Sequence, residues 1–259
     1  MVVNGSQVCE WCVRIPRTRL TRPESNSCQS TYLKSTMILE DQSSDNQNGS
    51  WLMYLPDHFK ENDKKEIAKL IEQFPLATMI CFLEGEFIAN HIPLLHDKDD
   101  EYIGHIAKAN LLHEFFPEGT KALAIFKAED SYISPNLYPT KLETHRHVPT
   151  WNYQVVHLHG NLSFTHLKKD KVAIVGKLTK QYERIYSGKE EWKMADAPKD
   201  YIDQMIENIV AFRFKVDRVS AKSKLSQNRE DIDFLSVQNV MGDLNKTYLE
   251  NAMDRLVND

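Results

Sequence analysis

The sequence predicts a mainly β fold with flanking helices (α+β), built around an antiparallel barrel. Strand-length apolar segments follow one another through the middle of the chain with short turns between them, whereas a parallel sheet would need a long helix between strands. The longer helical patterns are confined to one early segment and the last third. With 259 residues, of which 41% are hydrophobic, the chain can bury a sizeable core.

The first 52 residues differ from the rest in composition. They hold five basic and five acidic residues, three of the four cysteines and little hydrophobic periodicity. Such a segment cannot bury enough apolar area to fold well, although its arginines resemble those of a transit peptide. We expect residues 1–52 to be a disordered extension, or an upstream stretch included by an early start codon. A folded domain at 53–229 and a helical tail at 230–259 follow.

Cys9 and Cys12 form a CxxC motif in this extension. Only Cys28 could join them, because no histidine precedes His58, and a structural zinc ion needs four ligands. The sequence therefore does not favour a metal site there. No apolar run approaches the roughly 20 residues that span a membrane, and we expect a cytoplasmic protein.

The first element of the folded domain is a predicted helix. Asp63 is an N-cap with Glu66 three positions later, which resembles a capping box. Apolar residues then recur at helical spacing until Pro75 stops the helix. They are Ile67, Leu70, Ile71 and Phe74.

Strands occupy most of the chain from there to residue 164. Glu84 and Gly85 form the first turn, a short helical stretch covers 111–116, and a long polar loop runs from Pro135 to His147. The predicted extended segments are 76–83, 87–95, 102–107, 122–126, 131–134, 148–160 and 162–164.

Helices return in the last third. One is predicted from Asp170 to Ser187, ended by Gly188, and another begins at Pro198. Apolar and charged residues alternate at 212–219, which predicts an amphipathic strand. A final helix is expected from Asp231.

One predicted strand, Val148 to Gly160, carries more aromatic and polar side chains than an ordinary core strand. Alternation places one set on one face and leaves Asn152, Gln154, Val156 and Leu158 on the other. The first set is Trp151, Tyr153, Val155, His157 and His159. This pattern suits a wall for a planar polar ligand, a subunit interface, or a buried strand whose polar groups are satisfied by neighbours.

Polar islands interrupt the strand pattern at 90–93, 104–110, 132–139, 149–153 and 223–229. The second and fifth combine cationic, hydroxyl and amide groups, which are the donors that a phosphate group needs. The aromatic and apolar islands suit a flat ring system. Each island alone can be an ordinary strand end or turn, but their joint occurrence favours a ligand site.

Six segments, in the same order, resemble the PaiB-type FMN-binding negative transcriptional regulators of the split β-barrel flavin-binding superfamily. They are MYLPDHF at 53–59, ANHIPLL at 89–95, GHIAKAN at 104–110, YISPNLYP at 132–139, VPTWNYQVVHLHG at 148–160 and KLSQNR at 224–229. The resemblance covers most of the folded domain.

The resemblance implies an antiparallel split barrel of FMN-binding type, a homodimer, and FMN in a groove between subunits. It assigns His91, Ile92, Pro93 and Leu94 to the isoalloxazine, and His105, Ala107, Lys108 and Asn110 to the ribityl chain and phosphate. Further cofactor-binding candidates are Trp151, Tyr153, Lys224, Ser226, Gln227 and Arg229. As an alternative, Trp151, Tyr153 and His157 form the dimer seam beside the groove.

The chain departs from the family pattern at three positions. Leu111 stands where proline is expected, and Leu137 and Ser223 stand where aromatic residues are expected. Lost aromatic rings would loosen the packing of the flavin or of the dimer seam, so retention of FMN is left open. The pairs His145/His147 and His157/His159 leave a bound metal or haem as an alternative, although no carboxylate is obviously placed to complete such a site.

The resemblance favours a regulator that lowers transcription. Removing the first 52 residues from the totals of 32 basic and 37 acidic residues leaves 27 and 32, so the acidic body suggests an indirect effect through a partner. Direct DNA binding would need a shared basic face. That face would be Arg213, Lys215, Arg218, Lys222 and Lys224.

Two other functions are open. One is a flavin-dependent oxidoreductase acting on a small molecule, with His105, Tyr153 and His157 as candidate proton donors. The other is a dimeric interaction module whose flavin site has decayed.

Overall fold

The computed structural model describes residues 53–116 and 119–258. The expected extension at 1–52, with its CxxC motif, lies outside these residues. In the described part of the chain, no helix is both long and apolar enough to cross a membrane.

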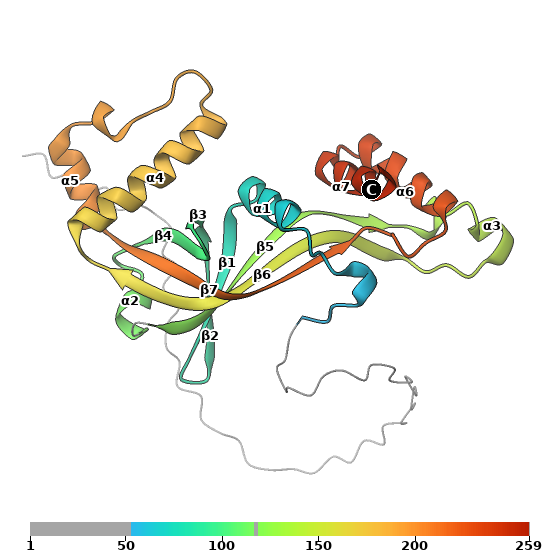
Figure 1. Ribbon diagram of the computed structural model, residues 1–259, viewed down its shortest axis with the longest axis horizontal. Coiled ribbons are helices and arrows are strands. Elements are labelled where there is room, and N and C mark those ends of the chain that lie inside the picture. Colours follow the sequence, from blue (N-terminus) through green and yellow to red (C-terminus); the bar gives the residue numbers. More distant parts are fainter. Residues whose placement is uncertain (1–52, 117–118, 259) are drawn as a thin grey trace, which may run out of the picture. The chain divides into compact units, whose positions relative to one another are not determined.

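The chain forms seven strands with helices before, between and after them (Figure 1). The strands are β1 (Leu76–Leu83), β2 (Glu86–Pro93), β3 (Leu95–Lys98), β4 (Glu101–Ala107), β5 (Thr120–Ile133), β6 (Thr150–Thr165) and β7 (Ile209–Lys224). The α-helices are α1 (Lys64–Gln73), α2 (Leu112–Phe115), α3 (Lys141–Thr144), α4 (Lys168–Tyr186), α5 (Lys199–Glu207), α6 (Asp231–Asp243) and α7 (Thr247–Asn258). Short 3₁₀ turns lie at η1 (Asp57–Phe59), η2 (Pro135–Leu137) and η3 (Met194–Asp196).

All seven strands belong to one sheet in the order β2-β1-β5-β6-β7-β4-β3, and every pairing is antiparallel. Residues from both ends of this order share one core, since Ile92 of β2 and Ile106 of β4 pack in the same buried cluster as Phe126 and Leu158. The sheet therefore curls around its core, and the predicted antiparallel split-barrel fold class is confirmed.

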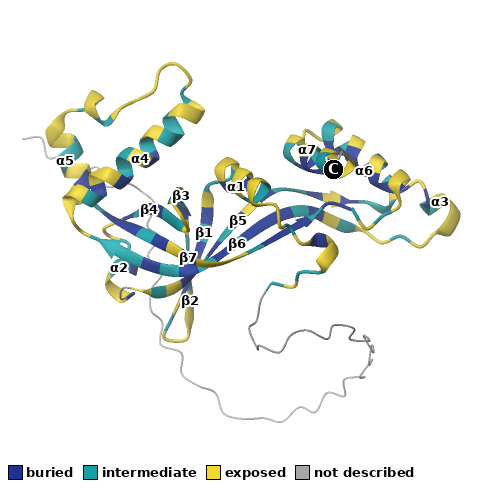
Figure 2. Ribbon diagram, in the orientation of Figure 1, coloured by how far each residue is buried: buried dark blue, intermediate teal, exposed yellow. Residues whose placement is uncertain are grey.

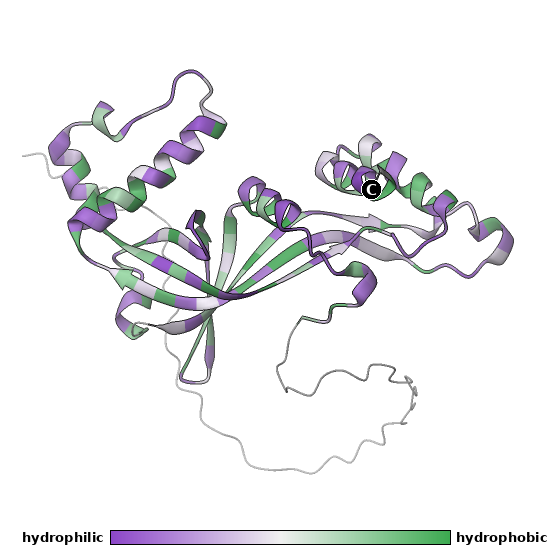
Figure 3. Cartoon of the chain, in the orientation of Figure 1, coloured by the Kyte–Doolittle hydropathy of each residue, from purple (hydrophilic) through white to green (hydrophobic). Residues whose placement is uncertain are grey.

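The central strands β5, β6 and β7 are longer than predicted. Their pairings contain β-bulges, after which the alternation of side chains between the two faces resumes. β5 shifts register between Lys127 and Asp130, and β6 shifts against β7 between His159 and Gly160. Each bulge lets a strand continue past a break in its period-2 pattern. Figure 2 shows the resulting alternation of buried and exposed residues along these strands, and Figure 3 shows the matching alternation of hydropathy.

The predicted turns and caps account for the first elements. The Asp63 side chain accepts a hydrogen bond from the amide of Lys65 and starts α1. Glu84 and Gly85 both have positive φ, the conformation that a two-residue hairpin turn requires.

Helices lie at both ends of the long strands (Figure 1). Ile174 and Leu178 of α4 pack on Ile103 and Ala211 at the end where β6 stops and β7 starts. At the other end, α6 and α7 bury Val237, Met241, Leu249 and Met253 against Ile133 and Leu225. The helical tail thus covers the extended ends of β5 and β7.

Candidate functional site

The structure brings one group of predicted site residues together beside the ends of β2 and β4. We call this group the β2–β4 cluster; it consists of His91, Ile92, Pro93, Leu94, His105, Ala107, Lys108 and Asn110. Ile92 and Leu94 are buried in the core, whereas His91 is exposed. The Asn110 side-chain amide donates to Asn90 Oδ1 at 2.8 Å, which ties the loop after β4 to β2.

The β2–β4 cluster contains polar groups without protein partners. The Lys108 side chain is exposed and makes no hydrogen bond or ion pair with the described residues. His105 Nδ1 is buried and also has no hydrogen-bond partner. Burial lowers the pKa of His105, so the imidazole is held neutral at physiological pH. A free cation therefore lies in the same cluster as an unsatisfied neutral ring nitrogen.

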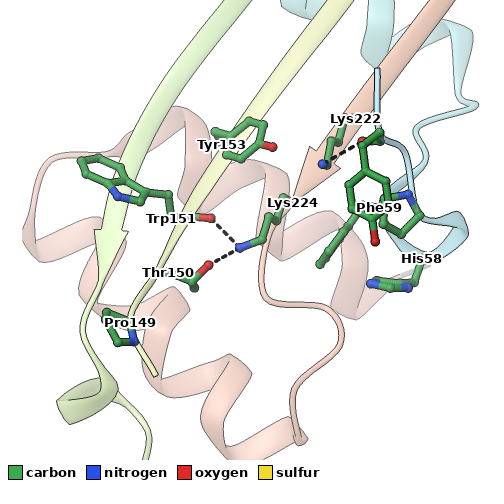
Figure 4. Close-up of a pocket in the computed structure, with 10 residues that line it drawn as sticks. His58, Phe59, Pro149, Thr150, Trp151, Tyr153, Lys222 and Lys224 are labelled. Atoms are coloured by element: carbon green, nitrogen blue, oxygen red, sulfur yellow. Dashed lines mark hydrogen bonds between the residues drawn. The ribbon is translucent and has the colours of Figure 1, made fainter. Parts of the chain in front are cut away.

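A second group of side chains lines a cavity of about 490 Å³ where β6 begins and β7 ends (Figure 4). We call it the lysine–aromatic pocket. Its lining residues are Tyr54, Pro56, His58, Phe59, Pro149, Thr150, Trp151, Tyr153, Lys222 and Lys224. Three of the predicted site residues, Trp151, Tyr153 and Lys224, belong to it. Tyr54, Phe59 and Lys222 were not predicted as site residues, although the MYLPDHF motif contains the first two.

Hydrogen bonds hold both lysines of this pocket in place. Lys224 Nζ donates to Thr150 Oγ1 at 2.5 Å and to the Trp151 carbonyl at 2.7 Å (Figure 4). Lys222 Nζ donates to the Tyr54 carbonyl at 3.1 Å. The Trp151 ring points away from the lysines, toward Tyr132, at a centroid distance of 5.8 Å.

The remaining predicted residues form a turn between β7 and α6. The Asn152 side-chain amide donates to Ser226 Oγ at 3.0 Å, and Gln227 bonds the amide of Leu225 and the carbonyl of Ser223. The Arg229 guanidinium lies 4.8 Å from the centroid of the Tyr138 ring. Their polar groups thus contact the protein itself, and their assignment to the cofactor stays a prediction.

One chain does not bring the two groups together. His105 pairs with Ala211 of β7, which pairs with Thr165 at the last position of β6, whereas Trp151 lies at the start of that strand. Fourteen residue steps of an extended strand span roughly 45 Å. A single flavin cannot touch the β2–β4 cluster and the lysine–aromatic pocket of the same chain.

Uncharged side chains form two rows on the outer side of the sheet, and the exposed Arg218 of β7 lies at the end of the second row, beside His159. Strand register places His91, Thr78, Ile125, His157 and Ser220 in one row across β2, β1, β5, β6 and β7. The next row contains Ile80, Leu123 and His159. Burial and then the nearby His159 lower the pKa of His157, while burial and then Arg218 lower that of His159. We call these eight residues the outer face.

The five basic residues considered for DNA binding do share one side of β7, because the extra residue at Asp217 shifts the alternation between Lys215 and Arg218. Arg213 is paired with Glu101 at 2.5 Å, and Lys222 is buried. Only Lys215 and Arg218 are both exposed and without a hydrogen bond or ion pair to the described residues. The charge available on this side is therefore small.

The histidine pairs were considered for metal or haem. Within residues 53–116 and 119–258, no three His, Cys, Asp or Glu side chains are grouped to hold a metal ion. His147 instead lies 2.9 Å from Thr140 Oγ1, beside the buried Asp233. His157 and His159 lie 6.5 Å apart between ring centroids.

Comparison with solved structures finds similar chains at low sequence identity. The FAD and heme binding protein from Mycobacterium smegmatis has a TM-score of 0.49 and 14% identity, covering 69% of this chain and 79% of that one. The flavocytochrome Anf3 from Azotobacter vinelandii has a TM-score of 0.49 and 12% identity, covering 68% and 75%.

Comparison of sequences gives closer matches. Residues 53–218 match the family model described as "Putative FMN-binding domain". The chain is 33% identical over 189 residues to the protease synthase and sporulation protein PAI 2 of Bacillus subtilis (strain 168), covering 71% of this chain and 87% of that protein. It is 31% identical over 154 residues to the uncharacterized protein YKL070W of Saccharomyces cerevisiae, covering 51% and 90%. The chain belongs to the PaiB-type FMN-binding family, and its cofactor is FMN.

Proposed function

We propose that the protein is an FMN-binding homodimer that lowers the expression of target genes indirectly. The observation that carries this proposal is the β2–β4 cluster, where an exposed lysine without a partner among the described residues follows a strand whose His105 has a buried ring nitrogen without a hydrogen-bond partner. The Bacillus subtilis relative is named for protease synthase and sporulation. That name supports a regulatory role.

The donor set of the β2–β4 cluster fits FMN. Lys108 would bind the phosphate, for which a compact ammonium charge is well suited. His105 Nδ1 is a buried polar atom without a partner, and such atoms usually acquire one from a ligand or water. Ile92 and Leu94 are buried in the core, so His91 and Pro93 are the predicted ring contacts that remain accessible to the isoalloxazine. When bound, FMN supplies redox chemistry, while the protein supplies its position and surroundings.

The outer face supports the proposal of a dimer. Its side chains are mostly apolar or neutral, and core positions of interfaces are depleted in charged residues in the same way. A two-fold axis would place the same face of both copies in contact. His91, at the edge of this face, belongs to the β2–β4 cluster, so a groove between the copies would border the flavin.

The charge distribution supports an indirect effect on transcription. Non-specific DNA binding needs several lysine or arginine contacts to phosphates, and two of the five candidate residues are free for them. A mobility-shift assay with the purified protein at low salt tests this point. We expect no shift; a salt-sensitive shift with random duplex DNA would contradict the indirect mechanism.

Flavin binding is tested by absorption spectroscopy and by titration of the apoprotein with FMN. We expect Lys108→Ala to weaken FMN binding by about tenfold or more, because one charge-assisted contact to phosphate is lost. Lys189→Ala is the matched control, since Lys189 is exposed and makes no hydrogen bond or ion pair with the described residues. Equal FMN affinity in both variants would remove the cluster from the flavin site.

The neutral His105 favours one second candidate, a flavin-dependent oxidoreductase. An imidazole whose pKa is lowered is neutral at physiological pH and can accept a proton as a general base. Reduction of the bound flavin by NADH or NADPH, measured by loss of flavin absorbance, tests this function. The candidate fails if neither nucleotide reduces the flavin, or if His105→Gln reacts as fast as the parent.

A further inference from the structure

The lysine–aromatic pocket contains cationic and aromatic side chains that a flavin bound at the β2–β4 cluster of the same chain would not contact. It lies at the far end of β6 and β7 from the β2–β4 cluster. Its volume of about 490 Å³ falls in the range of sites for small organic molecules. Its walls come from the segment around η1, the start of β6 and the end of β7.

Two positive charges line this pocket without a carboxylate among its described lining residues. The Lys222 side chain is only 7% exposed, and neither Lys222 nor Lys224 forms an ion pair with the described residues. Burying a cation without a counter-ion is unfavourable. Burial, followed by the charges of Lys222 and Arg229, lowers the pKa of Lys224. An anionic occupant would relieve this repulsion.

The two ammonium groups also have hydrogen-bond donors left over. Each carries three N–H groups. Lys222 uses one for the Tyr54 carbonyl, and Lys224 uses two, for Thr150 and Trp151. Donors on both groups therefore remain for the oxygens of one carboxylate or phosphate.

Aromatic rings surround the same charges. Lys222 Nζ lies 5.4, 5.9 and 5.6 Å from the ring centroids of Tyr54, Phe59 and Tyr153. Figure 4 shows Lys222 and Lys224 between Tyr153 and Phe59, with these rings turned toward the pocket. Flat apolar surface beside paired cations suits a ligand that is both planar and negatively charged.

We propose that the lysine–aromatic pocket binds a small organic anion in which a carboxylate or phosphate is attached to a flat ring, and that it does so independently of the flavin. The proposal requires selectivity for an anion and an added contribution from the ring.

Calorimetric titration of the full-length, FMN-loaded protein tests both requirements. The probes are benzoate and phenyl phosphate. Benzyl alcohol is the control for benzoate and lacks its charge, and inorganic phosphate is the control for phenyl phosphate and lacks its ring. We expect benzoate to bind at least about tenfold more tightly than benzyl alcohol, and phenyl phosphate more tightly than inorganic phosphate. Equal binding within either pair, or no binding of the ring-bearing anions, would overturn the proposal.

Substitutions in the pocket test whether benzoate binds there. Lys222→Met and Lys224→Met should each weaken benzoate binding by about tenfold, whereas Lys215→Met, an exposed lysine of the same strand, should leave it unchanged. Because Lys222 is buried, Lys224→Gln decides the question if Lys222→Met fails to fold. The flavin content of all variants should match that of the parent. If the Lys224 variants lose FMN together with benzoate, or if FMN displaces benzoate, the pocket belongs to the flavin site and the proposal is wrong.

Discussion

His105 shows how one buried side chain can make stability depend on pH. Burial lowers its pKa in the folded protein below the usual value of about 6.5. Between these two values the unfolded chain binds more protons, so the free energy of unfolding rises with pH. The stabilisation from the neutral ring is fully present above about pH 6.5 and is lost as pH falls through the folded pKa.

We therefore expect the apoprotein to lose stability from pH 7 to pH 5, and His105→Gln to lose less. Urea unfolding at a series of pH values measures both slopes. His157 and His159 also have lowered pKa values and contribute to the parent slope, so the variant should retain part of it. Parallel curves for parent and variant would show that His105 is not held neutral.

Cys81 is a buried cysteine whose thiol we expect to be unreactive. Burial raises the pKa of its thiol to about 11, and the side chain is 2% exposed within the core. In a chain with Cys9, Cys12 and Cys28 changed to serine, we expect Cys81 to react with a disulfide reagent at pH 8 about a hundredfold more slowly than in urea, because only the thiolate attacks. Equal rates in native and unfolded protein would contradict its placement.

At the scale of elements, the sequence predicted the strands and turns whose positions are determined by local periodicity. The strand 76–83 and the following turn were predicted as they occur, because Glu84-Gly85 and continuous apolar residues identify both. β5 was predicted as two segments, 122–126 and 131–134, because its bulge breaks the period at Lys127 to Asp130. β3 was missed, since Leu95–Lys98 has a short and mostly polar sequence whose strand conformation depends on pairing with β4.

Two glycines give substitutions with opposite expected effects, and the first of them, Gly160, lies opposite the bulge in β7. A Cβ on Gly160 would lie 2.1 Å from the Lys215 carbonyl oxygen, and backbone cannot move aside as a flexible side chain can. We expect Gly160→Ala to destabilise the fold by about 3 kcal/mol or more. Gly176 lies in the interior of α4, where the nearest atom, Met194 Sδ, would be 3.9 Å away. Gly176→Ala should stabilise by about 0.5–1 kcal/mol. Thermal unfolding of the two variants measures these opposite changes in stability. A stabilised Gly160→Ala would disprove the close approach of Gly160 to the Lys215 carbonyl.

At the scale of the whole molecule, motif order predicted the family but not the distribution of the site. GHIAKAN and the Val148–Gly160 strand were both assigned to one cofactor. The register of β4, β7 and β6 places His105 and Trp151 at opposite ends of the sheet of one chain, so a cofactor between subunits could reach both only with residues from two copies, and the assignment stays a prediction. Strand pairing between distant segments decides this distance, and no local pattern in a single sequence reports it. Lys222 was missed as a pocket residue because its ring partners come from two segments, 53–59 and β6, that are far from it in the sequence.

The proposed dimer gives the whole-molecule prediction. Ile125 and His157 are adjacent at the centre of the outer face, and both are only partly buried in the single chain. Ile125→Asp would place a charge in the middle of the proposed contact, where burial of an unpaired carboxylate opposes association. In the monomer the same side chain remains partly exposed, so the fold itself should lose only about 1 kcal/mol.

Light scattering coupled to size-exclusion chromatography measures the outcome. We expect the parent to be a dimer and Ile125→Asp a monomer with weaker FMN binding, because the groove that borders the β2–β4 cluster is lost. Lys189→Asp carries a new carboxylate outside the outer face and should remain a flavin-loaded dimer. A dimeric Ile125→Asp would move the interface elsewhere. If the variant is a monomer and its FMN affinity is unchanged, residues of one chain are enough to bind the flavin. Of the two groups of side chains, the β2–β4 cluster would then be the one that binds it.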